Sequence, residues 1–351
     1  MPSLPLAKSA LLMLIIVIVS VVSWEIYLRN KGFETTYYDD PALWAHNRKM
    51  VYEPIDKATV FIGSSRIKFD LDITTWESIT GDHAIQLACV GSTPVPVLEN
   101  LANDENFKGK LVVDVVEGLF FSPTGADRRP KENIKYYKEE TPAQKASFHI
   151  NHLLESKIVF LDKEWNSLGA QLEELPITDR KGVQNFKGFP SDFGRVKFTR
   201  QEFMTDKMAG DTSIQNIVKN IWYMFGQANK EPPITGKTLD SMFAVVKKYT
   251  DKIKARGGTV IFVRPPSSGG YLMAEKKNFP REKYWNQLLI NTGCEGIHYE
   301  DYPLMANFIC PENSHLSLTQ AVSFTKELVR ILSDEKGWKF ANMYQRKSTN
   351  N

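Results

Sequence analysis

The sequence predicts an α/β protein built on a doubly wound parallel sheet. Short apolar runs rich in β-branched residues recur along the chain. They alternate little between apolar and polar positions, as strands covered on both faces do. Segments with helical periodicity lie between these runs. Alternation of strand and helix in this way is typical of a parallel sheet with helices on both faces.

Five runs are expected to form the strands, at residues 59–62, 85–88, 111–116, 259–263 and 296–299. Helices are expected at residues 94–101, 239–255 and 318–332. The second of these stops at Gly257-Gly258, a helix terminator placed directly before a strand. The chain therefore returns to the sheet after each helix.

Residues 122–233 interrupt this alternation. The stretch is too long for a simple crossover and too apolar in patches to be disordered. Its runs HINHLLESKIVFL and TSIQNIVKNIWYMFG are expected to be helices. We interpret the stretch as a mostly helical insertion packed over one edge of the sheet, beside the active site.

The N-terminal segment differs from the rest of the chain. Residues 9–24 carry no charge, and the apolar run extends to Leu28 if Glu25 lies at an interface. This gives about 20 residues, the span of a bilayer core. A cleaved signal peptide is the alternative, with a small-residue site at Val21-Val22-Ser23. We favour an uncleaved single-pass anchor in the cell inner membrane, with the remaining chain extracytoplasmic (periplasmic).

These features predict a simple layout. Residues 1–30 are the anchor or signal peptide and 31–54 a linker. Residues 55–335 are the α/β domain with its insertion, and 336–351 are a polar tail.

Composition excludes several classes of protein. The net charge of +3, with no arginine-rich block and no phosphate-binding loop, argues against a nucleic-acid partner. Three cysteines are too few for a disulfide-built scaffold, although Cys294 and Cys310 could pair. His149 and His152 lie on one face of an expected helix, but no third metal ligand is evident. No metal or cofactor is expected.

Functional groups of a parallel sheet collect where its strands end. The segments at those ends are residues 63–66, 87–94, 114–118, 263–269 and 311–316. They supply Gly63-Ser64-Ser65-Arg66 after the first strand and Gly91 after the second. The segment before the last helix supplies Glu312 and His315.

A glycine-serine turn, a second glycine turn and a D-x-x-H-like element in these places resemble the SGNH, or GDSL-type, hydrolase family. The resemblance covers roughly residues 55–125 and 235–335. It is closest to the membrane-anchored, extracytoplasmic branch that has Gly-Ser-Ser in place of Gly-Asp-Ser. That branch includes proteins of teichoic-acid D-alanylation and exopolysaccharide O-acetylation. The resemblance implies a flavodoxin-like, SGNH hydrolase-like sheet.

The resemblance also implies the roles of individual residues. Ser65 would be the nucleophile, His315 the base and Glu312 its carboxylate partner. The N–H groups of Ser65 and Gly91 would form the oxyanion hole.

The chemistry independently requires such a combination. A serine hydroxyl is a poor nucleophile until a base within hydrogen-bonding distance removes its proton. Histidine does this near neutral pH when a carboxylate holds its tautomer. Glu312 and His315 are three positions apart, so one turn of backbone can direct both into one cleft. Loss of one oxyanion donor typically costs about 3 kcal/mol, so the glycine position matters.

Two departures from the family pattern stand out. The family has an asparagine after the third strand that completes the oxyanion hole, whereas this chain has Glu117-Gly118. A carboxylate would repel an oxyanion, so either the hole has two donors, or Glu117 points away or binds a cation. The last block has Glu312 where the family has aspartate.

Each of these residues also has a simpler interpretation. Ser64 and Ser65 could cap the following helix, although His315 and Gly91 at matching strand ends favour a nucleophile. Arg66 is either a surface charge or a binder of an anionic part of the substrate. Arg264 could bind a substrate carboxylate or phosphate through a bidentate guanidinium contact. Alternatively, it could form a structural ion pair with Glu117.

The sequence therefore predicts a serine-dependent acyl ester hydrolase or O-acyltransferase. Its substrate would be an acylated envelope glycan or another small ester, with a membrane acyltransferase as a partner. The alternative is a catalytically inactive scaffold protein of a polysaccharide-modification system, for which Glu117 is the best evidence. A third interpretation is a glycan-binding module formed by the aromatic-rich insertion.

Overall fold

In the computed structural model, which describes residues 6–122, 126–173, 175, 188–228 and 231–342, the chain forms two compact units. The larger unit consists of Asp39–Glu140 and Gly188–Asn351. The smaller consists of Met1–Tyr38 and Thr141–Lys187.

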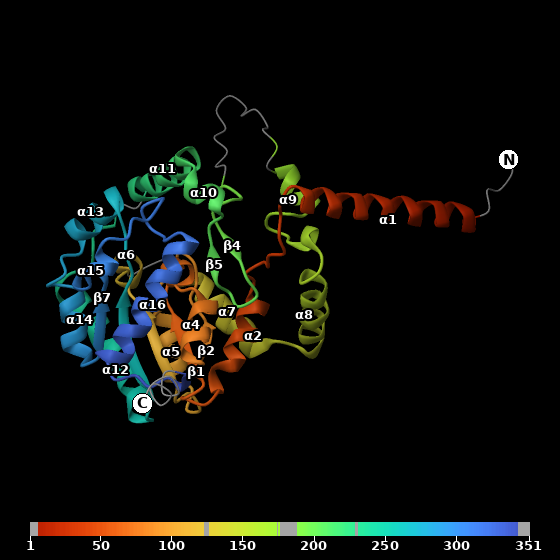
Figure 1. The fold of residues 1–351 in the computed structure, drawn as a ribbon. Helices are drawn as coiled ribbons and strands as arrows, with labels where there is room; N and C mark the ends of the chain where they lie inside the picture. Colours follow the sequence, from red (N-terminus) through yellow and green to blue (C-terminus); the bar gives the residue numbers. More distant parts are fainter. Residues whose placement is uncertain (1–5, 123–125, 174, 176–187, 229–230, 343–351) are drawn as a thin grey trace, which may run out of the picture. The chain divides into compact units, whose positions relative to one another are not determined.

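The larger unit is built on a five-stranded, all-parallel sheet, as the sequence predicts (Figure 1). The strand order is β2-β1-β3-β6-β7. The strands are β1 (Ala58–Ile62), β2 (His83–Gln86), β3 (Lys110–Asp114), β6 (Thr259–Arg264) and β7 (Glu295–His298). All run in one direction, so their carboxyl ends meet at one edge.

Successive residues of β1 and of β3 enter two different hydrophobic cores. Val60 and Ile62 pack into one core, while Phe61 between them packs into the other. On β3, Leu111 and Val112 divide in the same way. Both faces of the sheet are therefore covered, which explains why the inner strands β1, β3 and β6 have runs of consecutive apolar residues instead of alternating.

Helices cover each face. The first core contains side chains of α5 (Val95–Ala102), α12 (Gly236–Ala255) and α14 (Trp285–Thr292). The second contains side chains of α3 (Ser65–Asp70), α4 (Ile73–Thr80) and α16 (Leu318–Asp334). The helices expected at residues 94–101, 239–255 and 318–332 are present, with ends that shift by up to three residues.

The remaining elements of this unit are short or peripheral. They are α2 (Pro41–Lys49), η1 (Met50–Tyr52), α6 (Glu117–Phe120), α7 (Arg128–Glu139), β4 (Arg195–Val196), β5 (Glu202–Phe203), α10 (Asp206–Gly210), α11 (Thr212–Ala228), α13 (Gly269–Asn278), η3 (Tyr299–Asp301) and α15 (Pro303–Ala306). The stretch expected to be a linker thus contains α2. The expected polar tail includes Trp338 and Phe340, both buried in the second core; the rest of the tail, residues 343–351, lies outside the described residues.

A third, smaller hydrophobic cluster joins the α10–α11 region to α3, the helix that follows β1. Phe69 of α3 packs there with Phe193, Met208 and Val218. Strands β4 and β5 pair antiparallel nearby in the sequence. This cluster places α11 close to the segment that follows β1.

The smaller unit contains α1 (Leu6–Asn30), α8 (Pro142–Glu155), η2 (Val159–Leu161) and α9 (Leu168–Glu173). By length and composition, α1 can cross a membrane. Its last turns are tied to η2, because the Glu25 carboxylate accepts the N–H groups of Val159 and Phe160. Arg29 donates to the carbonyl of Lys157 at 2.7 Å.

The stretch expected to be one insertion is divided between the units. Residues 141–187 group with the N-terminal helix, and the part from Gly188 onward groups with the sheet. Of the two helices expected there, the first ends at Glu155 and is followed by η2 instead of continuing to Leu161. The second is α11. The packing of the whole stretch over a sheet edge stays a prediction.

Candidate active site

The turn after β1 is shaped around a buried carboxyl group, that of Asp114 at the end of β3. The N–H and the hydroxyl of Ser64 both donate to Asp114 Oδ2 at 2.8 Å. Gly63 permits this approach, because a Cβ there would stand 2.3 Å from the Asp114 Cβ. The chain leaves β1 toward β2 and leaves β3 toward β6, on opposite sides. The turn therefore lies at a switch point of the sheet, where parallel sheets bind ligands.

The two adjacent serines have different surroundings. Ser64 is buried and caps α3, accepting the N–H of Arg66 through its hydroxyl. Ser65 is the first residue of α3 and is only partly buried. Of the two serines that the sequence suggests as caps of the following helix, Ser64 is the cap. The Ser65 hydroxyl has another partner.

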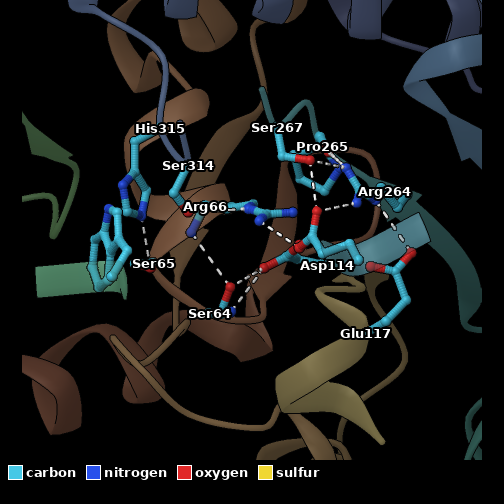
Figure 2. A network of polar contacts seen from close by, with 12 residues as sticks. Ser64, Ser65, Arg66, Asp114, Glu117, Arg264, Pro265, Ser267, Ser314 and His315 are labelled. Atoms are coloured by element: carbon cyan, nitrogen blue, oxygen red, sulfur yellow. Dashed lines mark hydrogen bonds and ion pairs between the residues drawn. The ribbon is translucent and has the colours of Figure 1, made fainter. Parts of the chain in front are cut away.

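That partner is His315, which lies 250 positions further along the chain (Figure 2). The distance from Ser65 Oγ to His315 Nε2 is 2.8 Å, and His315 Nδ1 lies 2.8 Å from Glu312 Oε1. Both distances are within hydrogen-bonding range and suit proton transfer. The structure therefore brings together hydroxyl, imidazole and carboxylate, the three groups that the sequence predicts to meet. We call Ser65, His315 and Glu312 the triad cluster.

Glu312 is fully buried, and three donors surround its carboxylate. Oε1 accepts the backbone N–H of His315 at 2.5 Å and faces the His315 ring. Oε2 accepts the indole N–H of Trp222 on α11 at 2.5 Å. Both oxygens are bonded, as a buried carboxylate requires.

The His315 ring is held from several sides. Phe69 stacks against it with ring centres 4.3 Å apart, and Phe193 and Trp222 contact it at 5.6 and 6.0 Å. The next residue, Leu316, donates its N–H to Asp70 Oδ1 at 2.9 Å. Only 1% of His315 is exposed, so solvent reaches the cluster from the Ser65 side.

Gly91 lies in the exposed turn after β2, with φ of +61°. This backbone conformation favours glycine, and an added Cβ would meet nothing within 4 Å. Within the described part of the chain, the N–H groups of Ser65 and Gly91 donate to no acceptor. Because β1 and β2 are neighbours, both turns lie at the same edge of the sheet.

Arg66 and Arg264 belong to a second group of charged residues, and Figure 2 shows both with Glu117. They are 1% and 3% exposed, and both contact Glu275 of α13 at 2.6 Å. Arg264 also pairs with Glu117 at 3.2 Å. We call these four residues the ion network. The structural alternative for Arg264, a pair with Glu117, is therefore present, and Arg66 is not a surface charge.

The buried carboxyl groups around the Ser64 turn differ in the direction of their pKa shifts. Burial pushes up the pKa of Glu275, but the attraction of Arg264 and Arg66 outweighs it and leaves the pKa below its ordinary value. For Asp114, burial raises the pKa above its ordinary value in spite of the two hydrogen bonds from Ser64. Burial also raises the pKa of Asp70 well above its ordinary value. Oδ2 of Asp70 and Oδ1 of Asp114 have no partner among the described residues.

Sequence reasoning missed three of these residues. Asp114 was visible at a strand end, but nothing in the sequence showed that it braces Ser64. Glu275 and Trp222 lie within helices, 209 positions after Arg66 and 90 before Glu312. No local pattern marks either contact.

The described residues contain neither a disulfide nor a cluster of metal ligands. Cys89, Cys294 and Cys310 are free and buried, so the pair considered between Cys294 and Cys310 is not formed. Among the described residues, no group of three or more His, Cys, Asp or Glu side chains could hold a metal ion.

Comparison of the sequence with models of known protein families gives no match, and comparison with curated proteins gives none either.

Proposed function

We propose that this protein is a serine-dependent acyl ester hydrolase or O-acyltransferase that works through a Ser65 acyl-enzyme. The observation that carries the proposal is the continuous hydrogen-bonded line from the Ser65 hydroxyl through the His315 ring to Glu312. This line joins a nucleophile, a base and a group that orients the base.

In the first half-reaction, His315 Nε2 takes the proton of Ser65 as Oγ attacks the ester carbonyl carbon. The carbonyl oxygen becomes an oxyanion, which the N–H groups of Ser65 and Gly91 stabilise. The bond to the leaving alcohol then breaks, and that alcohol takes the proton from His315. Glu312 holds the Nδ1–H tautomer and stabilises the imidazolium formed between these steps.

In the second half-reaction, His315 removes a proton from water or from a sugar hydroxyl. The activated oxygen attacks the acyl carbon, the bond from that carbon to Ser65 Oγ breaks, and Oγ takes the proton back from His315. The product is either an acid or a new ester. The same residues serve both outcomes, so the acceptor decides between hydrolysis and transfer.

The fold supports this assignment. Numbered by sequence, the five sheet strands have the order 2-1-3-4-5, which is the flavodoxin-like order. Together with the Gly-Ser-Ser turn and the block before α16, this order supports membership of the SGNH-type hydrolases. The charge of Glu117, the main objection to catalysis, is matched by Arg264.

We further propose that the domain faces the periplasm from the inner membrane, with α1 as its anchor. The substrate would be an acylated envelope glycan or another extracytoplasmic ester, and a membrane acyltransferase could supply the acyl group. The length and apolar composition of α1 support this location.

A fluorophosphonate probe tests the proposal, because attack of Ser65 Oγ on phosphorus expels fluoride and leaves a stable adduct. We expect labelling of the wild type and of Ser64→Ala, and none of Ser65→Ala. Turnover of p-nitrophenyl acetate by the detergent-solubilised full chain should follow the same pattern.

Labelling that is the same in Ser65→Ala as in wild type would contradict the proposal. Absence of both labelling and turnover in folded wild type would favour the inactive scaffold instead. Glycan binding that survives Ser65→Ala and His315→Ala without turnover would favour a glycan-binding module.

A further inference from the structure

One hydrogen bond to the triad cluster comes from a residue outside it. The indole Nε1 of Trp222 donates to Glu312 Oε2 at 2.5 Å. The other oxygen, Oε1, is occupied by the backbone N–H and the ring of His315. Trp222 therefore bonds the one carboxylate oxygen that His315 does not use.

We propose that Trp222 is a positioning residue for the reaction: its indole N–H fixes the plane of the Glu312 carboxylate so that Oε1 faces His315 Nδ1. This inference rests on the proposed function. It assigns a role to α11, which belongs to the stretch that interrupts the strand-helix alternation.

The chemistry of Glu312 explains why such a donor is needed. A glutamate side chain has one more rotatable bond than an aspartate, so its carboxylate plane is less restricted by the backbone. Hydrogen bonds to an ionised carboxylate are short and strong, and a bond to each oxygen sets its orientation. Because Glu312 is fully buried, water cannot replace a lost donor at Oε2.

Trp222 is itself held in place by other rings. Phe189 and Phe225 contact the indole with ring centres 5.1 and 6.0 Å away. Phe193 and Tyr271 contact it at 6.0 and 6.3 Å. The indole thus belongs to an aromatic cluster that also contacts His315. A positioning residue must have a restricted position of its own.

Two substitutions separate the hydrogen bond from the packing. Trp222→Phe keeps an apolar ring and removes the N–H. Trp222→His loses apolar surface but can place Nε2 where the indole Nε1 lies, because the imidazole overlays the five-membered half of the indole. A packing role ranks the phenylalanine variant as more active, and a donor role ranks the histidine variant as more active.

We expect Trp222→Phe to lower kcat for p-nitrophenyl acetate about tenfold to hundredfold with little change in KM, the range for a hydrogen bond to a charged group. Trp222→His should recover most of this loss, because its imidazole N–H can donate to Glu312 Oε2.

In Trp222→Phe, the acid limb of the pH–rate profile should also move to higher pH, because the charged carboxylate of Glu312 has lost a hydrogen-bond donor. The matched control is Trp76→Phe, since that buried indole N–H has no acceptor in the described structure; its acid limb should not move.

Each outcome decides the inference. Wild-type kcat in both Trp222 variants, or a phenylalanine variant more active than the histidine variant, overturns it while leaving the proposed function intact. If Trp222→His does not fold, an unmoved acid limb in Trp222→Phe overturns it. Absence of Ser65-dependent turnover in the wild type overturns the proposed function first, before any Trp222 variant is measured.

Discussion

The triad cluster and the ion network balance their buried charges in different ways; Figure 2 shows Ser65 and His315 of the first and Arg66, Arg264 and Glu117 of the second. In the ion network, two arginines face two glutamates, and every charged group is buried against an opposite charge. In the triad cluster, the buried carboxylate faces a histidine and an indole, neither of which carries a permanent charge. Ser65, the hydroxyl member of the triad cluster, is partly exposed.

The triad cluster and the ion network therefore differ in whether their cationic side chains can exchange a proton near neutral pH. An arginine stays protonated and cannot exchange a proton near neutral pH. A histidine can, and its partner carboxylate gains most from the bond when the ring becomes charged. We therefore expect changes in the triad cluster to affect rate, and changes in the ion network to affect stability.

The largest effect is expected for Glu312→Gln. The amide is similar in shape to the carboxylate, but it cannot stabilise the imidazolium and can hold the wrong tautomer of His315. The rate of Ser65 labelling should fall about 10³–10⁴-fold. The unfolding midpoint in urea, measured in parallel, should change little by comparison.

The matched change in the ion network is Glu117→Gln, which should keep the labelling rate within a few-fold of wild type. Equal losses of rate in the two variants would show that the comparison between the regions is wrong.

Next in size is the loss of stability in Glu275→Gln. This change removes the carboxylate that both buried arginines share and leaves their charge partly uncompensated. Breaking a buried pair in this way costs about 3–5 kcal/mol. Urea unfolding of the full chain measures the free energy.

Glu132→Gln is the control, because Glu132 pairs with Arg128 and both side chains are exposed to solvent. Exposed pairs contribute about 0–1 kcal/mol. A loss in Glu275→Gln no larger than in the control would mean that the ion network does not stabilise the site.

The sheet and the meeting of the triad cluster could be predicted because both follow from topology. Runs that are apolar at every position indicate strands covered on both faces, and parallel strands bring their carboxyl ends to one edge. That rule places residues 65 and 315 at one edge without any knowledge of side-chain contacts. The alternative pairing of Arg264 with Glu117 followed from the same rule.

The supporting contacts could not be predicted, because they depend on packing. Trp222 reaches Glu312 from a helix outside the regular alternation, and Glu275 reaches two arginines from the interior of α13. An acidic residue and a tryptophan within helices have no signal that distinguishes them from surface or core positions. The division of residues 122–233 between two units is likewise invisible in local patterns.

A pH-dependent effect is expected for Asp70, which supports the triad cluster through the N–H of Leu316. Burial raises its pKa, so the folded protein binds this proton more tightly than the unfolded chain does. The contribution of Asp70 to stability is therefore complete below the unfolded pKa of about 4 and declines as the pH rises through the folded pKa. Asp70→Asn lacks this proton, so its free energy of unfolding does not decline in this way. Between the unfolded and the folded pKa, the free energy of the variant relative to that of the wild type should therefore rise by up to about 1.4 kcal/mol per pH unit.

Urea unfolding at a series of pH values measures this gain, and a constant offset from the new amide does not affect the slope. Asp39→Asn should behave in the opposite way. Burial opposes ionisation of Asp39, but Arg200 and Lys68 outweigh it and lower its pKa. The wild type should therefore exceed Asp39→Asn above about pH 4, and the difference should shrink as the pH falls. Parallel pH curves for wild type and Asp70→Asn would mean that Asp70 is charged in the folded protein, and that the triad cluster tolerates a second buried carboxylate beside Glu312.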